Sequence, residues 1–230
     1  MTRVPSFFLT FLVLGLYLPP CAITGDDVAP LQASGGTLSA KSPHQTIRMD
    51  TEEVTVRLNR RGYTVDAVFQ MVNSGETSTE WVGFPKGDEL PETGGRPGFG
   101  SSTLPDFSLF RAWVDGKEIK FSKEGDRWLA GQVTFPGHAT TTIRIVYEAD
   151  YYRGDHLTYI TGTGSHWKES IRKAAFTVDG SAIGGSKPFW AGLSDRPKIH
   201  RLISEKAVRI EVEDYEPSLK AVLSVGVGRP

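Results

Sequence analysis

Four side chains suited to acid–base or metal chemistry occur close together in one polar stretch. Asp155 and His156 are adjacent, and His166 and Glu169 follow after a segment with two glycines. An imidazole within hydrogen-bond reach of a carboxylate can act as a general base or a metal ligand. The segment would have to fold back on itself to assemble such a site. A hydrolytic site here is therefore a hypothesis that depends on the fold.

No sequence motif supports that hypothesis. The chain lacks the G-x-S-x-G, H-E-x-x-H, P-loop and G-x-G-x-x-G patterns, and no two of its five histidines are two or four positions apart. Asp88, Glu89 and Glu92 offer oxygen ligands for calcium but lack the spacing of a calcium loop. We predict no catalytic residue, no metal site and no cofactor, and we expect that the protein is not an enzyme.

Five tryptophans suggest a different chemistry, because a flat indole can stack on a sugar ring. Three of them fall in alternating segments and are assigned to the core: Trp81, Trp113 and Trp128. Trp167 and Trp190 lie beside glycines, between such segments. We predict that Trp167, its neighbour His166 and Trp190 form the binding residues. An alternative for Trp167 is that it caps the end of the core and the glycines allow a turn.

The first 22 residues have the layout of a secretory signal peptide. Arg3 precedes an apolar run from Phe7 to Leu18, and prolines and small residues follow. The run is too short to cross a bilayer core, which takes about 20 residues. We expect cleavage after Ala22 and export to the periplasm or the exterior, with lipid attachment at Cys21 as an alternative. Because Cys21 is the only cysteine, we expect no disulfide.

The charges are balanced and mixed along the chain, with 26 Lys and Arg against 27 Asp and Glu. Nucleic acids and anionic lipid surfaces are usually bound by blocks or patches of basic residues, and no such block occurs. No second apolar stretch approaches membrane length either. We therefore predict neither a nucleic-acid partner nor a membrane span.

Short β-strands are expected along most of the remaining chain. Residues 23–44 lack periodicity and are rich in small residues, which predicts a flexible lead-in. From Glu53 onward, apolar residues recur at every second position, and turn sequences such as Asn73-Ser74-Gly75 separate the runs. Strands at intervals of about 8–12 residues favour an all-β, immunoglobulin-like β-sandwich.

The length allows one large sandwich or two packed sandwich-like halves. We expect a β-sandwich domain over residues 45–150, and a second β-rich domain or an extension of the first over 151–230. The seam would lie near 150–155. Residues 86–105, rich in glycine and proline, are expected to form a long loop.

A series of short motifs runs through the first two thirds of the chain. They are Gly35-Gly36-Thr37, Ile47-Arg48-Met49, Phe69 to Gly75, Trp81 to Pro85, Trp113 to Lys117, Phe135-Pro136-Gly137, Ile143 to Tyr147 and Thr161 to Trp167. In this order the chain resembles, over about residues 35–178, an uncharacterised family of exported bacterial proteins classed as a domain of unknown function. The resemblance implies an all-β, sandwich-like exported protein and supplies no catalytic residues.

The expected function is that of an exported, non-enzymatic protein. It would bind another envelope component, a protein or a glycan, through loops at one end of the sandwich, where such scaffolds usually place recognition. Two alternatives are a cell-envelope hydrolase that uses the residues of 155–169, and a purely structural accessory module of an envelope assembly.

Overall fold

The structure is a computed structural model of the 230-residue chain. It describes residues 39–40, 45–85, 107–124, 128–151, 156–183, 189–203, 206–218 and 221–228. The expected leader with Cys21, most of the expected lead-in and the expected loop over 86–105 lie outside the described residues.

Nearly all of the described residues belong to β-strands. The strands are β1 (Ser39–Ala40), β2 (Ile47–Leu58), β3 (Gly62–Asn73), β4 (Ser78–Pro85), β5 (Leu109–Val114), β6 (Lys117–Ile119), β7 (Ser122–Glu124), β8 (Trp128–Phe135), β9 (Ala139–Asp150), β10 (His156–Ile160), β11 (Ile171–Asp179), β12 (Phe189–Leu193), β13 (Arg196–Ile203), β14 (Ala207–Tyr215) and β15 (Val222–Val227). Two short 3-10 segments, η1 (Gly162–His166) and η2 (Ser181–Ile183), accompany them. Within the described ranges, no helix has the length and apolar character needed to cross a membrane.

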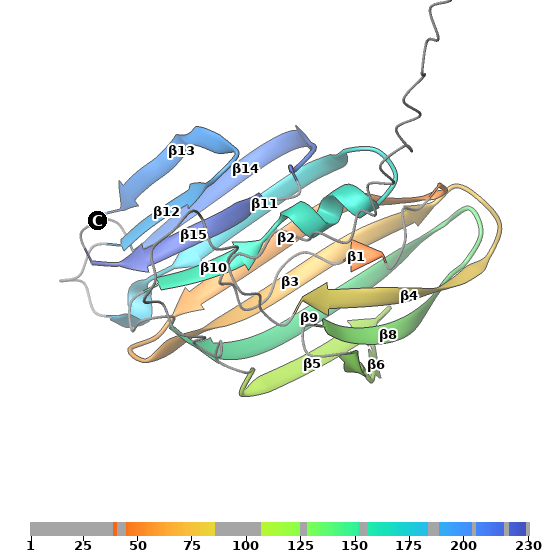
Figure 1. Ribbon diagram of the computed structural model, residues 1–230, viewed down its shortest axis with the longest axis horizontal. Helices are drawn as coiled ribbons and strands as arrows, with labels where there is room; N and C mark the ends of the chain where they lie inside the picture. Colours follow the sequence, from red (N-terminus) through yellow and green to blue (C-terminus); the bar gives the residue numbers. More distant parts are fainter. Residues whose placement is uncertain are drawn as a thin grey trace, which may run out of the picture.

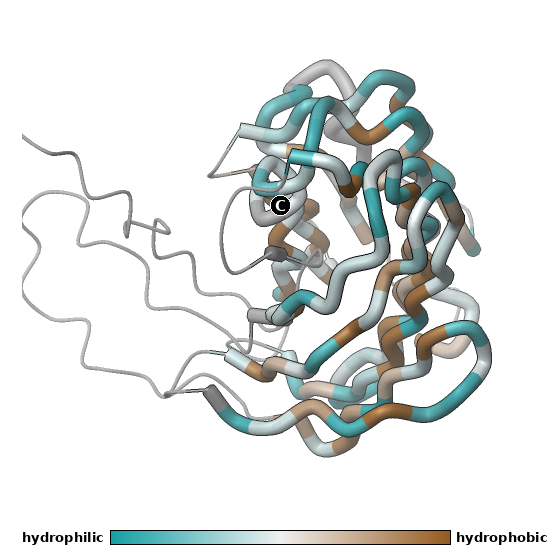
Figure 2. The backbone as a smooth tube through the Cα atoms, turned by 90° about the vertical axis from the view of Figure 1, so that its right-hand side faces the viewer, coloured by the Kyte–Doolittle hydropathy of each residue, from teal (hydrophilic) through white to brown (hydrophobic). Residues whose placement is uncertain are grey.

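The strands follow from period-two alternation. In β3, the side chains of Tyr63, Val65, Ala67, Phe69 and Met71 are buried, whereas those between them are exposed or half-buried. Successive side chains of a strand point to opposite faces, so such a sequence buries one face and leaves the other to solvent. Figure 2 shows the same alternation of hydrophobic and hydrophilic stretches along the chain.

The strands form one large sheet and two small ones. The large sheet has seven strands in the order β14-β11-β2-β3-β9-β5-β6. The first small sheet has the order β10-β15-β12-β13 and the second has the order β1-β4-β8-β7. All neighbouring strands are antiparallel except β11 and β2, which are parallel. In Figure 1 the first small sheet overlies the β14–β11–β2 side of the large sheet, and the second overlies the β9–β5 side.

Both small sheets pack on the same face of the large sheet. The inward side chains of the large sheet, such as Phe69, Tyr147 and Phe176, share one continuous core with Phe84 and Leu223 of the small sheets. The opposite face of the large sheet is exposed or half-buried, apart from the small side chain of Ala175. The predicted all-β sandwich of packed sheets is confirmed.

The expected seam near residues 150–155 does not divide the large sheet. Strands β11 and β14, which come after it, extend the sheet formed by β2, β3 and β9, which come before it. Alternation predicts where strands lie along the chain, but it does not predict their order in a sheet. The parallel pairing of β11 with β2 could therefore not be predicted from local patterns.

A polar network is buried between the layers. Glu52 of β2 is 0% exposed, and the Tyr159 hydroxyl donates a hydrogen bond to its Oε1 atom over 3.1 Å. The hydroxyl groups of Tyr215 and Thr161 lie 3.0 Å apart, and the Tyr215 hydroxyl donates to Asp195 Oδ1 over 3.3 Å. Burial raises the pKa of the Tyr215 phenol, so it stays protonated and can donate. These hydrogen bonds tie β2 and β14 of the large sheet to the first small sheet.

Ion pairs cover the outward face of the large sheet. Asp50 of β2 accepts hydrogen bonds from Arg172 of β11 in a bidentate arrangement (3.0 and 2.7 Å) and from Arg48 over 2.9 Å. The same face carries further pairs: Arg144 with Asp66, Arg111 with Glu118, and Arg209 with Glu53 and Glu211. This face therefore consists largely of charges that neutralise one another.

Replacing Asp50 with asparagine is expected to make stability less dependent on pH. The hydrogen bond from Arg172 lowers the pKa of Asp50, so the folded state favours the ionised carboxylate. Its contribution is present above the unfolded pKa of about 3.9 and is lost as the pH falls through the lower, folded-state value. Urea unfolding should show Asp50→Asn to be less stable near pH 7, by at most about 1 kcal/mol. A difference that persists below pH 2 would contradict this explanation.

Candidate functional site

The outward face of the small sheets differs in chemistry from that of the large sheet. Residues opposite each other in a ladder point to the same side, so the register identifies the outward positions. On β10, β15 and β12 they are His156, Thr158, Ile160, Val222, Ser224, Gly226, Trp190 and Gly192. On β4 and β8 they are Thr79, Trp81, Gly83, Trp128, Ala130, Gln132 and Thr134. None of these positions is Asp, Glu, Lys or Arg, and together we call them the small-sheet face. Ile160 and Val222 are buried against each other on this face, and Glu124 of β7 lies opposite Trp128 at its edge.

A histidine–tryptophan pair lies on the first small sheet. His156, Gly226 and Trp190 form one row across three strands. The indole lies over Gly226, because a Cβ atom added to that glycine would overlap the indole Nε1. The His156 ring contacts the indole edge-on, with centroids 5.8 Å apart at 63°. Glycine is therefore required at position 226 if the indole is to lie against the sheet.

Hydroxyl groups adjoin this aromatic pair. The next row of the same face contains Thr158 and Ser224, which are opposite each other and half-buried. A half-buried indole beside hydroxyl groups can stack on the apolar face of a sugar ring and hydrogen-bond to its hydroxyls. We call Trp190, His156, Thr158, Ser224 and Gly226 the Trp190 site.

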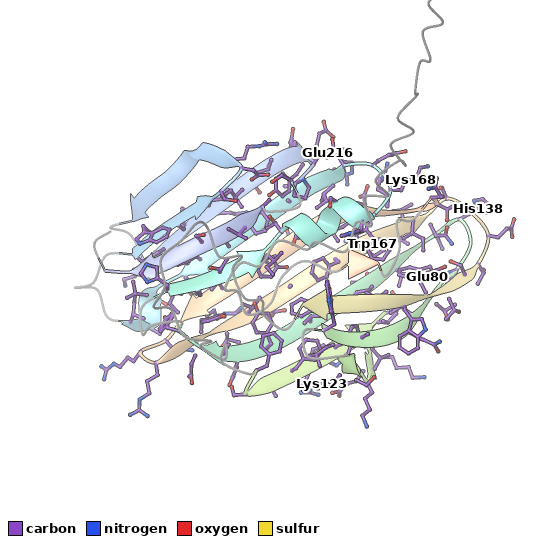
Figure 3. The ribbon with its side chains drawn as sticks, viewed as in Figure 1. Glu80, Lys123, His138, Trp167, Lys168 and Glu216 are labelled. Carbon is purple, nitrogen blue, oxygen red and sulfur yellow. The ribbon has the colours of Figure 1, made fainter. Side chains whose placement is uncertain are left out.

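Trp167 belongs to the core. It is 4% exposed, and its ring packs edge-on against Phe135 of the second small sheet with centroids 6.1 Å apart. In Figure 3, Trp167 lies beside η1 in the interior of the view, whereas Lys168, the next residue, lies at the periphery. The sequence alternative in which Trp167 caps the core agrees with this burial. His166 ends η1 and is half-buried. Trp190, but not Trp167, therefore belongs to the small-sheet face.

The described residues of the hypothetical hydrolytic site are spread out. Asp155 lies outside the described residues. His156 begins β10, which rises about 13 Å to its other end at Ile160. His166 comes after that end, as the last residue of η1. Glu169 pairs with Lys168 over 3.4 Å and with Arg48 over 3.5 Å. Among the described residues, no group of three or more His, Cys, Asp and Glu could hold a metal. Asp88, Glu89 and Glu92, the possible calcium ligands, lie outside the described residues.

The core assignment of the three strand tryptophans is wrong. Trp81 points outward and is 42% exposed, and Trp128 points outward from β8 and is half-buried. Trp113 is half-buried on the outward face of the large sheet, between the guanidinium groups of Arg111 (4.8 Å) and Arg144 (5.3 Å). In each strand a small or aliphatic residue next to the tryptophan points inward: Val82, Ala112 and Leu129. The tryptophan beside it therefore points outward.

Sequence reasoning missed most of the Trp190 site because its members come from three separate segments. Thr158, Ser224 and Gly226 have no distinctive local pattern. Only the antiparallel pairing of β10, β15 and β12 brings them together. One signal was present in the sequence. Trp190 lies between the apolar residues Phe189 and Ala191, so in a strand it points to the face opposite to theirs.

Comparison with known proteins gives a fold but no family. No protein-family model matches the chain, and no curated protein matches it. The solved structure of a proposed nutrient binding protein from Legionella pneumophila superposes with a TM-score of 0.59 and 16% identity, covering 86% of this chain and 72% of that one. A likeness at this identity shows the fold alone.

Structures of an M1 zinc metallopeptidase are less similar. The Deinococcus radiodurans enzyme with the E323A substitution gives a TM-score of 0.41 and 11% identity, covering 80% of this chain and 43% of that one. A two-domain M1 enzyme bound to L-tryptophan gives 0.42 and 9%, covering 80% and 44%. This chain spans less than half of those enzymes. The metallopeptidase matches assign no activity to it.

Proposed function

We propose that this protein is a non-enzymatic binding protein whose Trp190 site holds an uncharged saccharide. The observation that carries the proposal is the indole of Trp190, which lies over Gly226 where the outward positions of β10, β15 and β12 include no Asp, Glu, Lys or Arg. An indole held against a sheet offers its other side to a flat ligand at little cost in side-chain entropy. The glycan alternative from the sequence thus takes precedence over a protein partner.

The surrounding chemistry supports a neutral polyhydroxylated ligand. Thr158 and Ser224 can both donate and accept hydrogen bonds, and the His156 ring carries a nitrogen donor and acceptor when neutral. The outward face of the large sheet, in contrast, is covered with ion pairs. An ionic ligand would have little to pair with at the Trp190 site. Binding through a sheet face replaces the expected binding through loops.

We also propose that the protein works outside the cytoplasm, in the periplasm or beyond it. The proposal is supported by the leader-like residues 1–22. The nutrient-binding role proposed for the Legionella protein would also be a binding function outside the cytoplasm. The likeness to that protein concerns the fold and does not support a shared ligand. N-terminal sequencing of the protein isolated from the host's periplasm should find Ile23 as the first residue, because the leader would be cleaved after Ala22.

Replacing Trp190 with alanine is expected to weaken saccharide binding at least tenfold, which corresponds to about 1.4 kcal/mol. The full chain is screened against cellohexaose, xylohexaose and chitohexaose, and the affinity for the best ligand is measured by titration calorimetry. The matched control is Trp113→Ala, which removes an equally half-buried, outward tryptophan from the opposite face. It should leave the affinity unchanged.

A second variant tests whether binding requires the Trp190 indole to lie against Gly226. Gly226→Val keeps Trp190 but places a side chain where the ring lies, so the ring has to leave its position. We expect a loss of affinity like that of Trp190→Ala, with folding confirmed by circular dichroism. Absence of binding to all three saccharides, or equal losses in Trp190→Ala and Trp113→Ala, would contradict the proposed function.

A further inference from the structure

A second aromatic surface lies on the other small sheet, and it shares the chemistry of the Trp190 site. Trp81 of β4 is 42% exposed and is, with Leu109, one of two exposed large hydrophobic residues in the described part of the chain. Opposite it in the ladder lies Gln132 of β8, which is also exposed. One row further on, Thr79 lies opposite Thr134, and their hydroxyl groups are 2.9 Å apart.

Small residues separate this surface from a second indole. Gly83 and Ala130 are opposite each other in the next row, and the row beyond contains Trp128. Trp81 and Trp128 therefore lie on either side of Gly83 and Ala130, and Ala130 is 4% exposed. The four-residue offset along the ladder corresponds to about 13 Å. Two indoles at this separation would contact two different rings of a chain-like ligand rather than the same ring.

We infer that β4 and β8 form a second binding site for an uncharged glycan chain. Its members are Trp81, Trp128, Thr79, Gln132 and Thr134, and we call it the Trp81 site. The inference rests on the proposed function of the Trp190 site, which it extends from a short saccharide to a polymer. The lack of charge supports the occupant, because the outward positions of β4 and β8 include no Asp, Glu, Lys or Arg. The acidic position in these rows is Glu124 of the edge strand β7, opposite Trp128.

The polar groups of the Trp81 site match the same ligand. The two threonine hydroxyls and the Gln132 carboxamide supply both donors and acceptors, as sugar hydroxyls require. The apolar surface is limited to the two indoles, because Ala130 between them is buried. Protein–protein interfaces more often bury a larger apolar centre around such an aromatic anchor. A glycan chain therefore fits this surface better than a second protein does.

Two sites on one layer have a consequence for affinity. The two small sheets pack on the same face of the large sheet, so the Trp190 and Trp81 sites both belong to the outward side of one layer. A polysaccharide surface offers many identical segments, and binding at one site raises the effective concentration of segments at the other. Retention on an insoluble polysaccharide should therefore exceed what either site achieves alone.

The experiment follows the indole N–H signals of the five tryptophans in a two-dimensional 15N NMR spectrum of the full chain, assigned by single Trp→Phe substitutions. The probe is the trisaccharide of the sugar that binds best among the three hexasaccharides. We expect the Trp190, Trp81 and Trp128 signals to shift during the titration. The signals of Trp113, on the opposite face, and Trp167, in the core, should stay in place. In Trp81→Ala, Trp190 should still report an unchanged Kd, whereas retention on the polysaccharide falls at least tenfold.

The outcomes separate the two proposals. Movement of the Trp190 signal alone, with unchanged polysaccharide retention in Trp81→Ala, would overturn the second site and leave the proposed function intact. If neither signal moves, the proposed function and this extension of it are both wrong. Capture of one envelope protein by the wild type but not by Trp81→Ala, with the Trp81 signal unmoved by saccharide, would show that the surface is a protein interface instead. Thermal unfolding checks that Trp81→Ala is folded.

Discussion

Replacing Trp167 with alanine is expected to lower the free energy of unfolding by about 3 to 5 kcal/mol. The indole is 4% exposed and packs against Phe135 at a point where η1 meets the second small sheet. Its removal would leave a cavity at the junction of two sheets and the 3-10 segment. Backbone hydrogen bonds from Trp167 to Gly164 and from Lys168 to Ile47 restrict the collapse that could fill it. Urea unfolding of the full chain measures the change.

Two controls separate a core role from a binding role for Trp167. Trp167→Phe keeps most of the buried ring and should lose clearly less stability than the alanine variant. Trp113→Ala removes an indole that is stacked between arginines at the surface, and should cost about 1 kcal/mol. If Trp167→Ala were as stable as the wild type but had lost saccharide binding, the residue would be a ligand contact and the core assignment would be wrong.

Replacing Gly62 with alanine should destabilise the protein by about 3 kcal/mol through a steric clash. A Cβ atom at this position would overlap the carbonyl oxygen of Ala149 and lie 3.1 Å from the Cα of Asp150. Both atoms belong to the backbone of β9, the partner of β3. Relief of the clash would therefore require the β3–β9 ladder to open at this end. Thermal and urea unfolding would report the loss.

Gly116→Ala is the matched control for Gly62→Ala. Gly116 has a φ of +79°, and a Cβ atom there would meet nothing within 4 Å. Its substitution should cost only the strain of a left-handed residue, about 1 to 2 kcal/mol. Gly62 does not have a positive φ. A loss at Gly62 no larger than that of Gly116→Ala would therefore mean that the contact with β9 is relieved without opening the ladder.

The strands were predictable from sequence, but the direction of several key side chains was judged from the wrong property. Residue type suggested that Trp81 is buried, because tryptophan is large and apolar. Parity in Ser78–Pro85 indicates the opposite, since Val82 and Phe84 share the face that Trp81 does not. In an alternating strand, the pair of aliphatic or aromatic residues outweighs one indole in deciding which face is buried.

The buried carboxylate of Glu52 shows a second limit. Parity with Val54 and Val56 places Glu52 inward, whereas Ile47 and Met49 have the other parity and are also buried. A register shift between Met49 and Thr51 makes both arrangements compatible. Nothing in the local sequence signals that irregularity. The hydrogen bond from Tyr159, 107 positions away, depends on packing between sheets, which local patterns do not encode.

The parallel pairing of β2 with β11 has a consequence for how the chain reaches its folded state. The paired residues are about 120 positions apart, so this contact closes a long loop and adds to the contact order. Until β11 has been synthesised, one edge of β2 has no neighbouring strand and exposes backbone donors and acceptors to other nascent chains. We therefore expect the large sheet to be completed late in folding, and a chain in which β11 is not yet paired to be more prone to aggregation than the folded protein.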